Sequence, residues 1–86
     1  MSAIVNVSQL GELVKARRKA LGLTQIELAQ RARCGHRLIR ELEHGKESIQ
    51  MGRALEICHL LNIKLLATMP DKTTVKADKL GEISFL

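Results

Sequence analysis

The sequence predicts a small all-α fold, and three features of the chain support this class. The 86 residues include one Phe and no Trp or Tyr. The core must therefore be aliphatic, which favours helices over a β-sandwich. Apolar residues recur at three- and four-residue steps, as in amphipathic helices, and glycines and capping residues separate the periodic segments. We therefore expect four helices, over residues 9–21, 25–32, 36–44 and 50–61.

The residues around these segments are typical of helix ends. Ser8 is the expected N-cap of the first helix, and Gly22 follows its end. The second helix opens with TQIE, a capping box in which the side chains of Thr24 and Glu27 bond each other's backbone amides. Gly45 follows the third helix and is expected to end it.

The apolar positions of each helix predict the buried face. The expected core residues are Leu10, Leu13, Val14 and Leu21, then Leu28, Ala29 and Ala32, then Ile39 and Leu42, and finally Met51, Ala54, Leu55, Cys58 and Leu61.

Residues 63–69 are too short for a helix and partly alternate, which predicts a short strand. A lone strand cannot satisfy its own backbone, and the folded region offers no second one. We expect the same strand of a second copy to pair with it across a two-fold axis, forming a homodimer through Ile63, Leu65, Leu66, Ala67 and Met69. Residues 70–86 are polar and charged up to an apolar tip, so the sequence predicts a folded domain over 1–69 and a flexible tail.

The charge and composition restrict the function. The formal net charge is +5, and residues 1–50 hold nine Lys or Arg against five Asp or Glu, which suits an anionic partner or serves solubility alone. No apolar run is long enough to span a membrane and no signal-peptide pattern opens the chain, so we expect a cytoplasmic protein. The two Cys and three His lack the paired spacing of zinc sites, and no catalytic pattern is present. We expect no enzyme activity, no metal and no cofactor.

The second and third segments match the helix-turn-helix pattern. Their break falls at Arg33-Cys34-Gly35, where Gly35 can pass the turn with little strain. At about 100° per residue, the third helix places Ile39 and Leu42 on its buried face. The opposite face carries His36, Arg37, Arg40, Glu41 and His44. Such side chains can read base edges in the major groove, although a merely solvated face is the alternative.

The sequence also resembles the Xre/Cro-type helix-turn-helix family of phage repressors, on the segments LGLTQIELAQRA (21–32), Ile39 and LEHGK (42–46). The resemblance covers residues 8–62 and implies a lambda-repressor-like bundle that binds double-stranded DNA at an inverted repeat. It implies base reading by His36, Arg37, Arg40 and Glu41. It also implies phosphate contacts by Thr24, Gln25, His44, Lys46 and Ser48, and a partly buried ion pair between Arg18 and Glu43.

The turn departs from this family. Many members carry Gly-Val-Ser or Gly-Thr-Thr where this chain has Arg33-Cys34-Gly35. The hydroxyl that would cap the third helix and could touch phosphate is therefore missing at residue 35. Leu38 also stands where Ser or Thr is common. We accordingly leave residue 35 out of the phosphate set.

Residues 45–70 resemble HipB-type antitoxins, in which a fourth helix is followed at once by a strand that pairs between subunits. This resemblance implies a repressor of its own operon that also binds a HipA-like kinase toxin, with Phe85 and Leu86 of the tail as a toxin contact. A plain disordered end is the alternative for the tail. Two other functions stay open: a solitary phage-type repressor, and an antitoxin or adaptor that acts mainly by protein docking.

Overall fold

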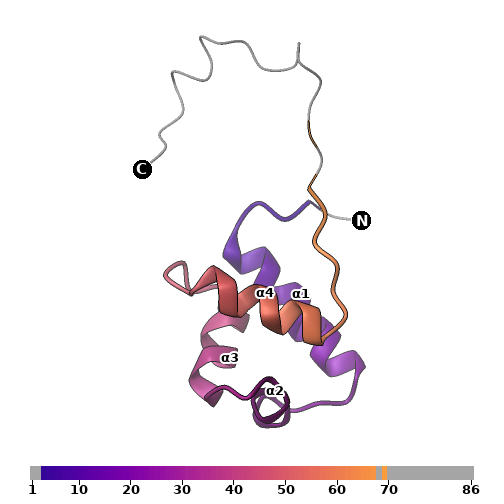
Figure 1. Cartoon of the computed structure of the whole chain (residues 1–86), viewed down its shortest axis with the longest axis vertical. Helices are drawn as coiled ribbons and strands as arrows, with labels where there is room; N and C mark the ends of the chain where they lie inside the picture. The colour runs from indigo at the N-terminus through magenta and orange to yellow at the C-terminus, as the bar shows by residue number, and fades with distance from the viewer. Residues whose placement is uncertain (1–2, 68, 70–86) are drawn as a thin grey trace.

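Four helices follow one another along the chain: α1 (Val7–Ala20), α2 (Gln25–Ala32), α3 (His36–Glu43) and α4 (Met51–Leu60). The computed structural model describes residues 3–67 and 69. The predicted all-α bundle is confirmed, and the helix ends differ from expectation by two residues at most. In Figure 1, α4 crosses in front of α1, and α2 is seen end-on beside α3. None of the helices in the described part of the chain is both long and apolar enough to cross a membrane.

The helix starts follow from their caps. The Asn6 side chain accepts from the backbone N–H of Gln9 at 2.8 Å, so Asn6 caps α1 and the expected cap at Ser8 is wrong. Asn is at least as good a cap as Ser, and using it adds two residues to the helix. The capping box of α2 is confirmed. The Thr24 hydroxyl accepts from the Glu27 amide at 3.1 Å, and the Glu27 carboxylate accepts from the Thr24 amide at 2.9 Å.

The core lies between the four helices, where α3 packs against α1 and α2, and α2 packs against α4. Its buried members are Leu10, Val14, Leu28, Ala29, Ile39, Leu42, Ala54, Ile57, Cys58 and Leu61. The predicted core residues Leu13, Leu21, Met51 and Leu55 are instead exposed. Helix α4 buries positions 54, 57 and 58, and its C-cap Leu61 continues the same i, i+3, i+4, i+7 stripe. The predicted face, which lacks Ile57, lies slightly too far around the helix.

Two glycines let α1 approach the C-terminal end of α3. A Cβ on Gly11 would lie 2.1 Å from the carbonyl oxygen of Leu42, so only a hydrogen fits there. Gly45 combines a positive φ of 74° with a Cβ position 2.6 Å from the Cα of Ser8. Gly45 is predicted from the sequence only as a helix stop, and the contact at Gly11 is not predicted. A glycine inside a helical pattern was the available signal for such a contact.

The chain after α4 leaves the bundle (Figure 1). The Arg17 side chain donates from Nε to the Leu61 carbonyl at 2.9 Å, which satisfies one of the free carbonyls at the end of α4. Ile63 packs against the core, and Leu66 and Met69 are 81% and 89% exposed. The described residues form no strand here, because a single strand has no ladder partner within one chain. The predicted tail, with Phe85 and Leu86, lies outside the described residues.

Candidate nucleic-acid interface

The turn between α2 and α3 depends on Arg33. This residue ends α2 in the left-handed conformation (φ 53°, ψ 46°), and the Cys34 amide closes the turn on the Ala29 carbonyl at 3.0 Å. A non-glycine residue in this conformation costs about 1–2 kcal/mol. Gly35 has an extended backbone (φ −74°, ψ 151°) that any residue adopts, so the freedom expected of it is not used. Half-buried Cys34 packs against the core.

Replacing Gly35 by Ser should raise the free energy of unfolding by a few tenths of a kcal/mol to about 1 kcal/mol. Gly35 is the N-cap of α3 without a side-chain hydrogen bond, and a Cβ there would meet nothing within 4 Å. Gly22→Ser is the matched control, since residue 22 is equally open but has a φ of +73° and should be destabilised by about 1 kcal/mol. Urea unfolding of both variants decides, and equal destabilisation would contradict the extended backbone at residue 35.

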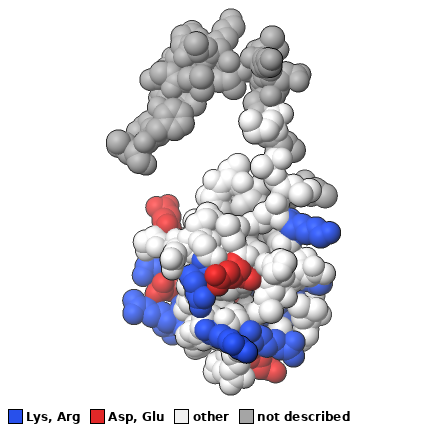
Figure 2. Space-filling model, viewed as in Figure 1, with Lys and Arg blue, Asp and Glu red and all other residues white. Residues whose placement is uncertain are grey.

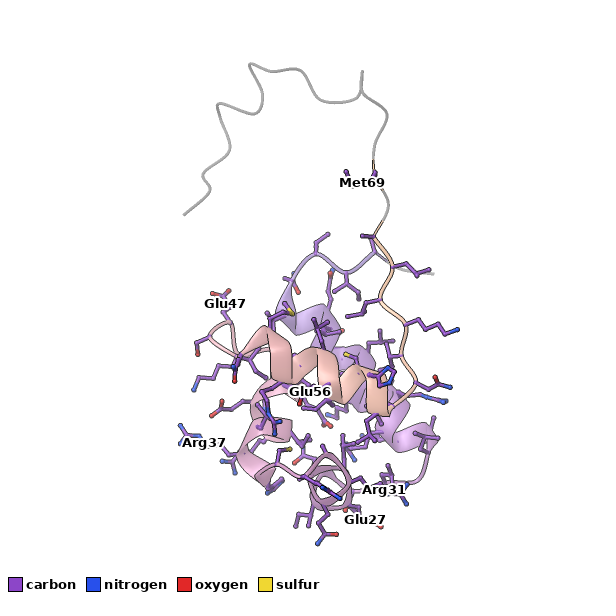
Figure 3. All side chains as sticks on the ribbon, in the orientation of Figure 1. Glu27, Arg31, Arg37, Glu47, Glu56 and Met69 are labelled. Carbon is purple, nitrogen blue, oxygen red and sulfur yellow. The ribbon has the colours of Figure 1, made fainter. Side chains whose placement is uncertain are left out.

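The outward face of α3 carries three exposed nitrogen-bearing side chains, His36, Arg37 and Arg40. The opposite side is held in the core by Ile39 and Leu42, with Leu38 packed at its edge. Figure 3 shows the Arg37 side chain pointing away from the bundle. These three predicted base-reading residues therefore share one exposed surface, and the opposite side of the helix is held in the core.

Glu41 differs from the other three, because its carboxylate is already engaged. It accepts from Nε of Arg37 at 2.6 Å, and Nζ of Lys46 lies 3.4 Å from the same oxygen. The hydrogen bond from Arg37, followed by that from Lys46, holds the pKa of Glu41 below its ordinary value. The Arg37 side chain is 77% exposed, against 23% for Glu41. Glu41 is thus placed to orient Arg37 rather than to reach outward by itself.

The predicted phosphate contacts lie at both ends of α3. Gln25, at the start of α2, is half-buried and accepts from Nε2 of His36 at 2.9 Å, which joins the two helix starts. The Thr24 hydroxyl is exposed and caps α2. Past the other end of α3 come three exposed residues, His44, Lys46 and Ser48. Two sets of polar groups therefore flank the base-reading face.

His44 has a restricted role at its end of α3. Its Nδ1 donates to the Arg40 carbonyl at 2.8 Å. A neutral ring held this way has only an acceptor left at Nε2, so it can donate to a phosphate only when protonated. Lys46 carries its positive charge without this condition.

Arg18 and Glu43 form the predicted ion pair, and its geometry is bidentate. Nε and Nη2 of Arg18 donate to the two carboxylate oxygens at 2.6 and 3.0 Å, while Nη1 donates to the Leu23 carbonyl at 2.7 Å. The side chains are 9% and 2% exposed. Burial alone would raise the pKa of Glu43, but hydrogen bonds from Arg18 and Gln25 and the charge of Arg18 outweigh it and lower the pKa. The hydrogen bond to Glu43 raises the pKa of Arg18.

The Gln25 amide is the third member of this cluster, which the sequence does not predict. Its Nε2 donates to Glu43 Oε1 at 3.0 Å. Every buried side-chain N and O in residues 3–67 and 69 has a hydrogen-bond partner. The pair therefore joins α1, the loop before α2, and α3 without an unsatisfied polar group.

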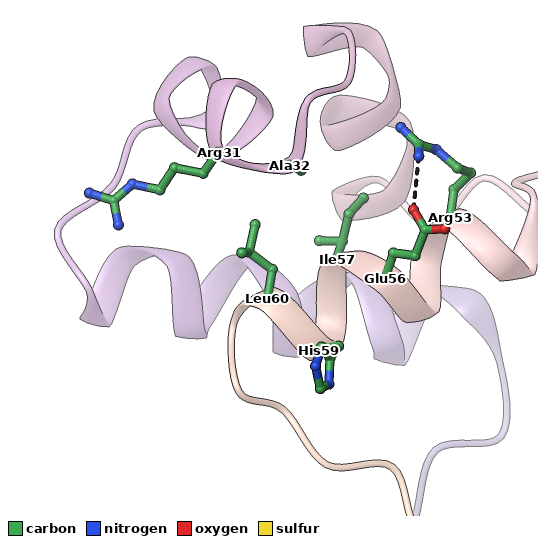
Figure 4. A pocket seen from close by; sticks show the side chains of 7 residues that line it. All are labelled: Arg31, Ala32, Arg53, Glu56, Ile57, His59 and Leu60. Atoms are coloured by element: carbon green, nitrogen blue, oxygen red, sulfur yellow. Dashed lines mark hydrogen bonds and ion pairs between the residues drawn. The ribbon is translucent and has the colours of Figure 1, made fainter.

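The overall charge distribution and the grooves of the bundle point to a ligand less directly than the face of α3 does. In Figure 2, Lys and Arg side chains gather over the end of the molecule formed by α2 and α3. An open groove of about 200 Å³ lies between α2 and α4 (Figure 4). Its lining combines an apolar floor with charged residues, of which Arg53 and Glu56 pair at 2.8 Å: Arg31, Ala32, Arg53, Glu56, Ile57, His59 and Leu60. Across the described residues, no three His, Cys, Asp or Glu side chains gather closely enough to hold a metal ion.

Comparisons with known proteins agree with this fold. Residues 14–67 match a family model described as helix-turn-helix. A chain of a HipB(S29A)–O2 20mer complex is similar in structure, with a TM-score of 0.70 and 23% identity over 85% of this chain and 99% of that chain. A structure named MDT Protein has a TM-score of 0.69 and 23% identity over 85% and 100% of the two chains. No curated protein matches the sequence. The family match spans more than half of the chain, and the chain therefore belongs to the helix-turn-helix family.

Proposed function

We propose that the protein is a homodimeric repressor of transcription that reads an inverted-repeat operator through α3. The family assignment and the HipB-like fold support a DNA-binding transcriptional regulator. The observation that carries the proposal is the face of α3, where His36, Arg37 and Arg40 are exposed above a buried apolar side. Side chains that could contact DNA phosphates flank this face at both ends of the helix.

The proposed recognition assigns a separate task to each group. The guanidinium groups of Arg37 and Arg40 can each give two hydrogen bonds to a guanine edge in the major groove. Glu41 holds Arg37 at 2.6 Å and limits the directions in which it can point. Thr24, Gln25, Lys46 and Ser48, and His44 when protonated, position the helix on phosphates. Affinity should therefore fall steeply with salt.

The dimer is proposed to form through residues 63–69. Leu65, Leu66 and Met69 are exposed apolar side chains on a segment that is neither helix nor strand in one chain. Pairing this segment with a second copy, with Ile63 and Ala67 in the same strand, would cover these side chains and satisfy the backbone. Two α3 helices about 34 Å apart would then match one turn of B-DNA.

Arg37→Ala should weaken binding to the specific operator by about 1–3 kcal/mol and relax the preference at one base position. The loss follows from removing a base contact rather than a charge alone. The measurement is fluorescence anisotropy on an operator duplex recovered from a random library and on a scrambled duplex. Arg53→Ala is the control, because it removes the same charge from α4. An equal loss on both duplexes for Arg37→Ala would contradict base reading by this residue.

We further propose that the protein is the antitoxin of a HipA-like kinase toxin and represses the operon of both. The HipB-like fold supports this role. Phe85 and Leu86 are the proposed toxin contacts. A pull-down from the native host, analysed for protein and DNA together, should recover a kinase and a promoter upstream of the chain's own gene. Recovery of DNA without a kinase would contradict the antitoxin role and favour a solitary repressor.

A further inference from the structure

A chain of hydrogen bonds links the buried ion pair to the first residue of α3. Arg18 donates to Glu43 at 2.6 Å, Gln25 Nε2 donates to Glu43 at 3.0 Å, and Gln25 Oε1 lies 2.9 Å from Nε2 of His36. This series of hydrogen bonds runs from the carboxylate of Glu43, which is 2% exposed, to the exposed imidazole of His36. The half-buried Gln25 is the only group that connects these two in the described part of the protein.

The direction of each hydrogen bond is set by the carboxylate of Glu43, at the buried end of the series. An ionised carboxylate only accepts, so the Gln25 amide has to turn its NH₂ group toward Glu43. A flipped amide would place its oxygen against the carboxylate and lose a hydrogen bond to a buried charge. The Gln25 oxygen therefore faces His36, and because it can only accept, the hydrogen must be on Nε2 of His36.

A neutral His36 with its hydrogen on Nε2 has an acceptor at Nδ1. No hydrogen-bond partner for Nδ1 occurs among residues 3–67 and 69, and the residue is exposed at the N-terminal end of α3. In the major groove, cytosine N4 and adenine N6 are donors. Guanine N7 and O6 and thymine O4 are acceptors and would meet the Nδ1 lone pair unfavourably.

We propose that the Arg18–Glu43 pair, acting through Gln25, fixes the tautomer of His36, and that His36 thereby selects an exocyclic amino group, on cytosine or adenine, at the base it contacts. This rests on the proposed function, since it specifies how one residue of α3 reads DNA. His36 is then a specificity-determining residue and Gln25 a positioning residue, in addition to any phosphate contact through its second amide hydrogen.

The base preference is tested by selecting duplexes from a randomised library at pH 8, where an imidazole is neutral. The wild-type chain should favour cytosine or adenine at one position by about fivefold, the size expected of one hydrogen bond. His36→Ala should remove the preference at that position alone, and His36→Asn should keep it, because an amide oxygen also accepts. Gln25→Met should weaken the preference at the same position, whereas Gln30→Met, on an exposed residue of α2, should not. A guanine or thymine preference there, or one unchanged in His36→Ala and Gln25→Met, would overturn the inference.

A second measurement needs no DNA, and because it is made on the wild-type chain, it does not depend on whether Gln25→Met folds. Long-range ¹H–¹⁵N spectra at pH 8 report which ring nitrogen of His36 carries the hydrogen. The Nε2–H form, with a ring proton protected by its hydrogen bond, is expected in the wild-type chain and in Gln30→Met. The Nδ1–H form would overturn the inference. If the wild-type chain enriches no sequence at all, both the proposed function and this inference fail. If the chain enriches a sequence that His36 does not affect, only the inference fails.

Discussion

Replacing Glu43 by Ala should lower the free energy of unfolding by about 3–5 kcal/mol, because one half of a buried ion pair is lost. Arg18 would keep its charge in a site where its side chain is 9% exposed, with only the Leu23 carbonyl as a hydrogen-bond partner. Gln25 would also lose its acceptor. Urea unfolding followed by circular dichroism measures the effect directly.

The control for this variant is Glu47→Ala. Glu47 lies exposed in the loop between α3 and α4 (Figure 3), and its removal should change stability by less than about 0.5 kcal/mol. A Glu43→Ala protein as stable as Glu47→Ala would contradict the buried pair.

The same pair predicts how stability depends on pH. The folded-state pKa of Glu43 lies below its ordinary value, so the unfolded chain takes up the proton more readily than the folded one. The stabilisation is fully present above the unfolded pKa of about 4.3 and is lost as pH falls through the lower folded value. Glu43→Gln should therefore lose less stability than the wild type between pH 5 and pH 3. Parallel curves for the two proteins would show that Glu43 does not titrate as the pair requires.

Gly11→Ala should destabilise the fold by about 3 kcal/mol or more, the upper part of the range for overpacking. The added Cβ would lie 2.1 Å from the Leu42 carbonyl oxygen and 3.0 Å from that of Glu43. Both atoms are backbone, so relief requires α1 to move away from α3. That movement would also disturb the Arg18–Glu43 pair between the same helices. Thermal and urea unfolding give the magnitude.

The sign of this result is diagnostic. At an unconstrained helical position, Gly→Ala stabilises by about 0.8–1 kcal/mol. Gly52, in the first turn of α4, offers that comparison, since a Cβ there meets nothing within 4 Å. Gly52→Ala should therefore stabilise the protein while Gly11→Ala destabilises it. Stabilisation by both substitutions would show that α1 and α3 are not in close contact at Gly11.

The features that follow from local chemistry could be predicted from the sequence. The four helices follow from periodic apolar residues, and the α2 capping box from residues three apart. The Arg18–Glu43 pair came from the family resemblance, and a bidentate contact now joins the two side chains. The Asn6 cap was missed because Asn6 and Ser8 are both good caps, and only the surrounding chain selects between them.

The features that depend on how helices meet could not be predicted in this way. Gly11 looks like a weak helix residue until α3 is placed against it. Arg33 adopts the left-handed conformation, although Gly35 is the nearby residue with that preference. Periodicity placed Glu41 on the outward face of α3, but it does not show that Arg37 and Lys46 occupy its carboxylate. The hydrogen bonds of Gln25 to Glu43 and His36 likewise join residues that lie 18 and 11 positions away.

The proposal that α3 enters the major groove is tested most directly by dimethyl sulfate protection of a duplex selected by the wild-type protein. This reagent methylates guanine N7 in the major groove and adenine N3 in the minor groove. Bound protein should protect guanine N7 in two half-sites about one helical turn apart, and Arg37→Ala should lose that protection at the same position in each. Protection of adenine N3 alone, or guanine protection unchanged in Arg37→Ala, would contradict major-groove reading by α3.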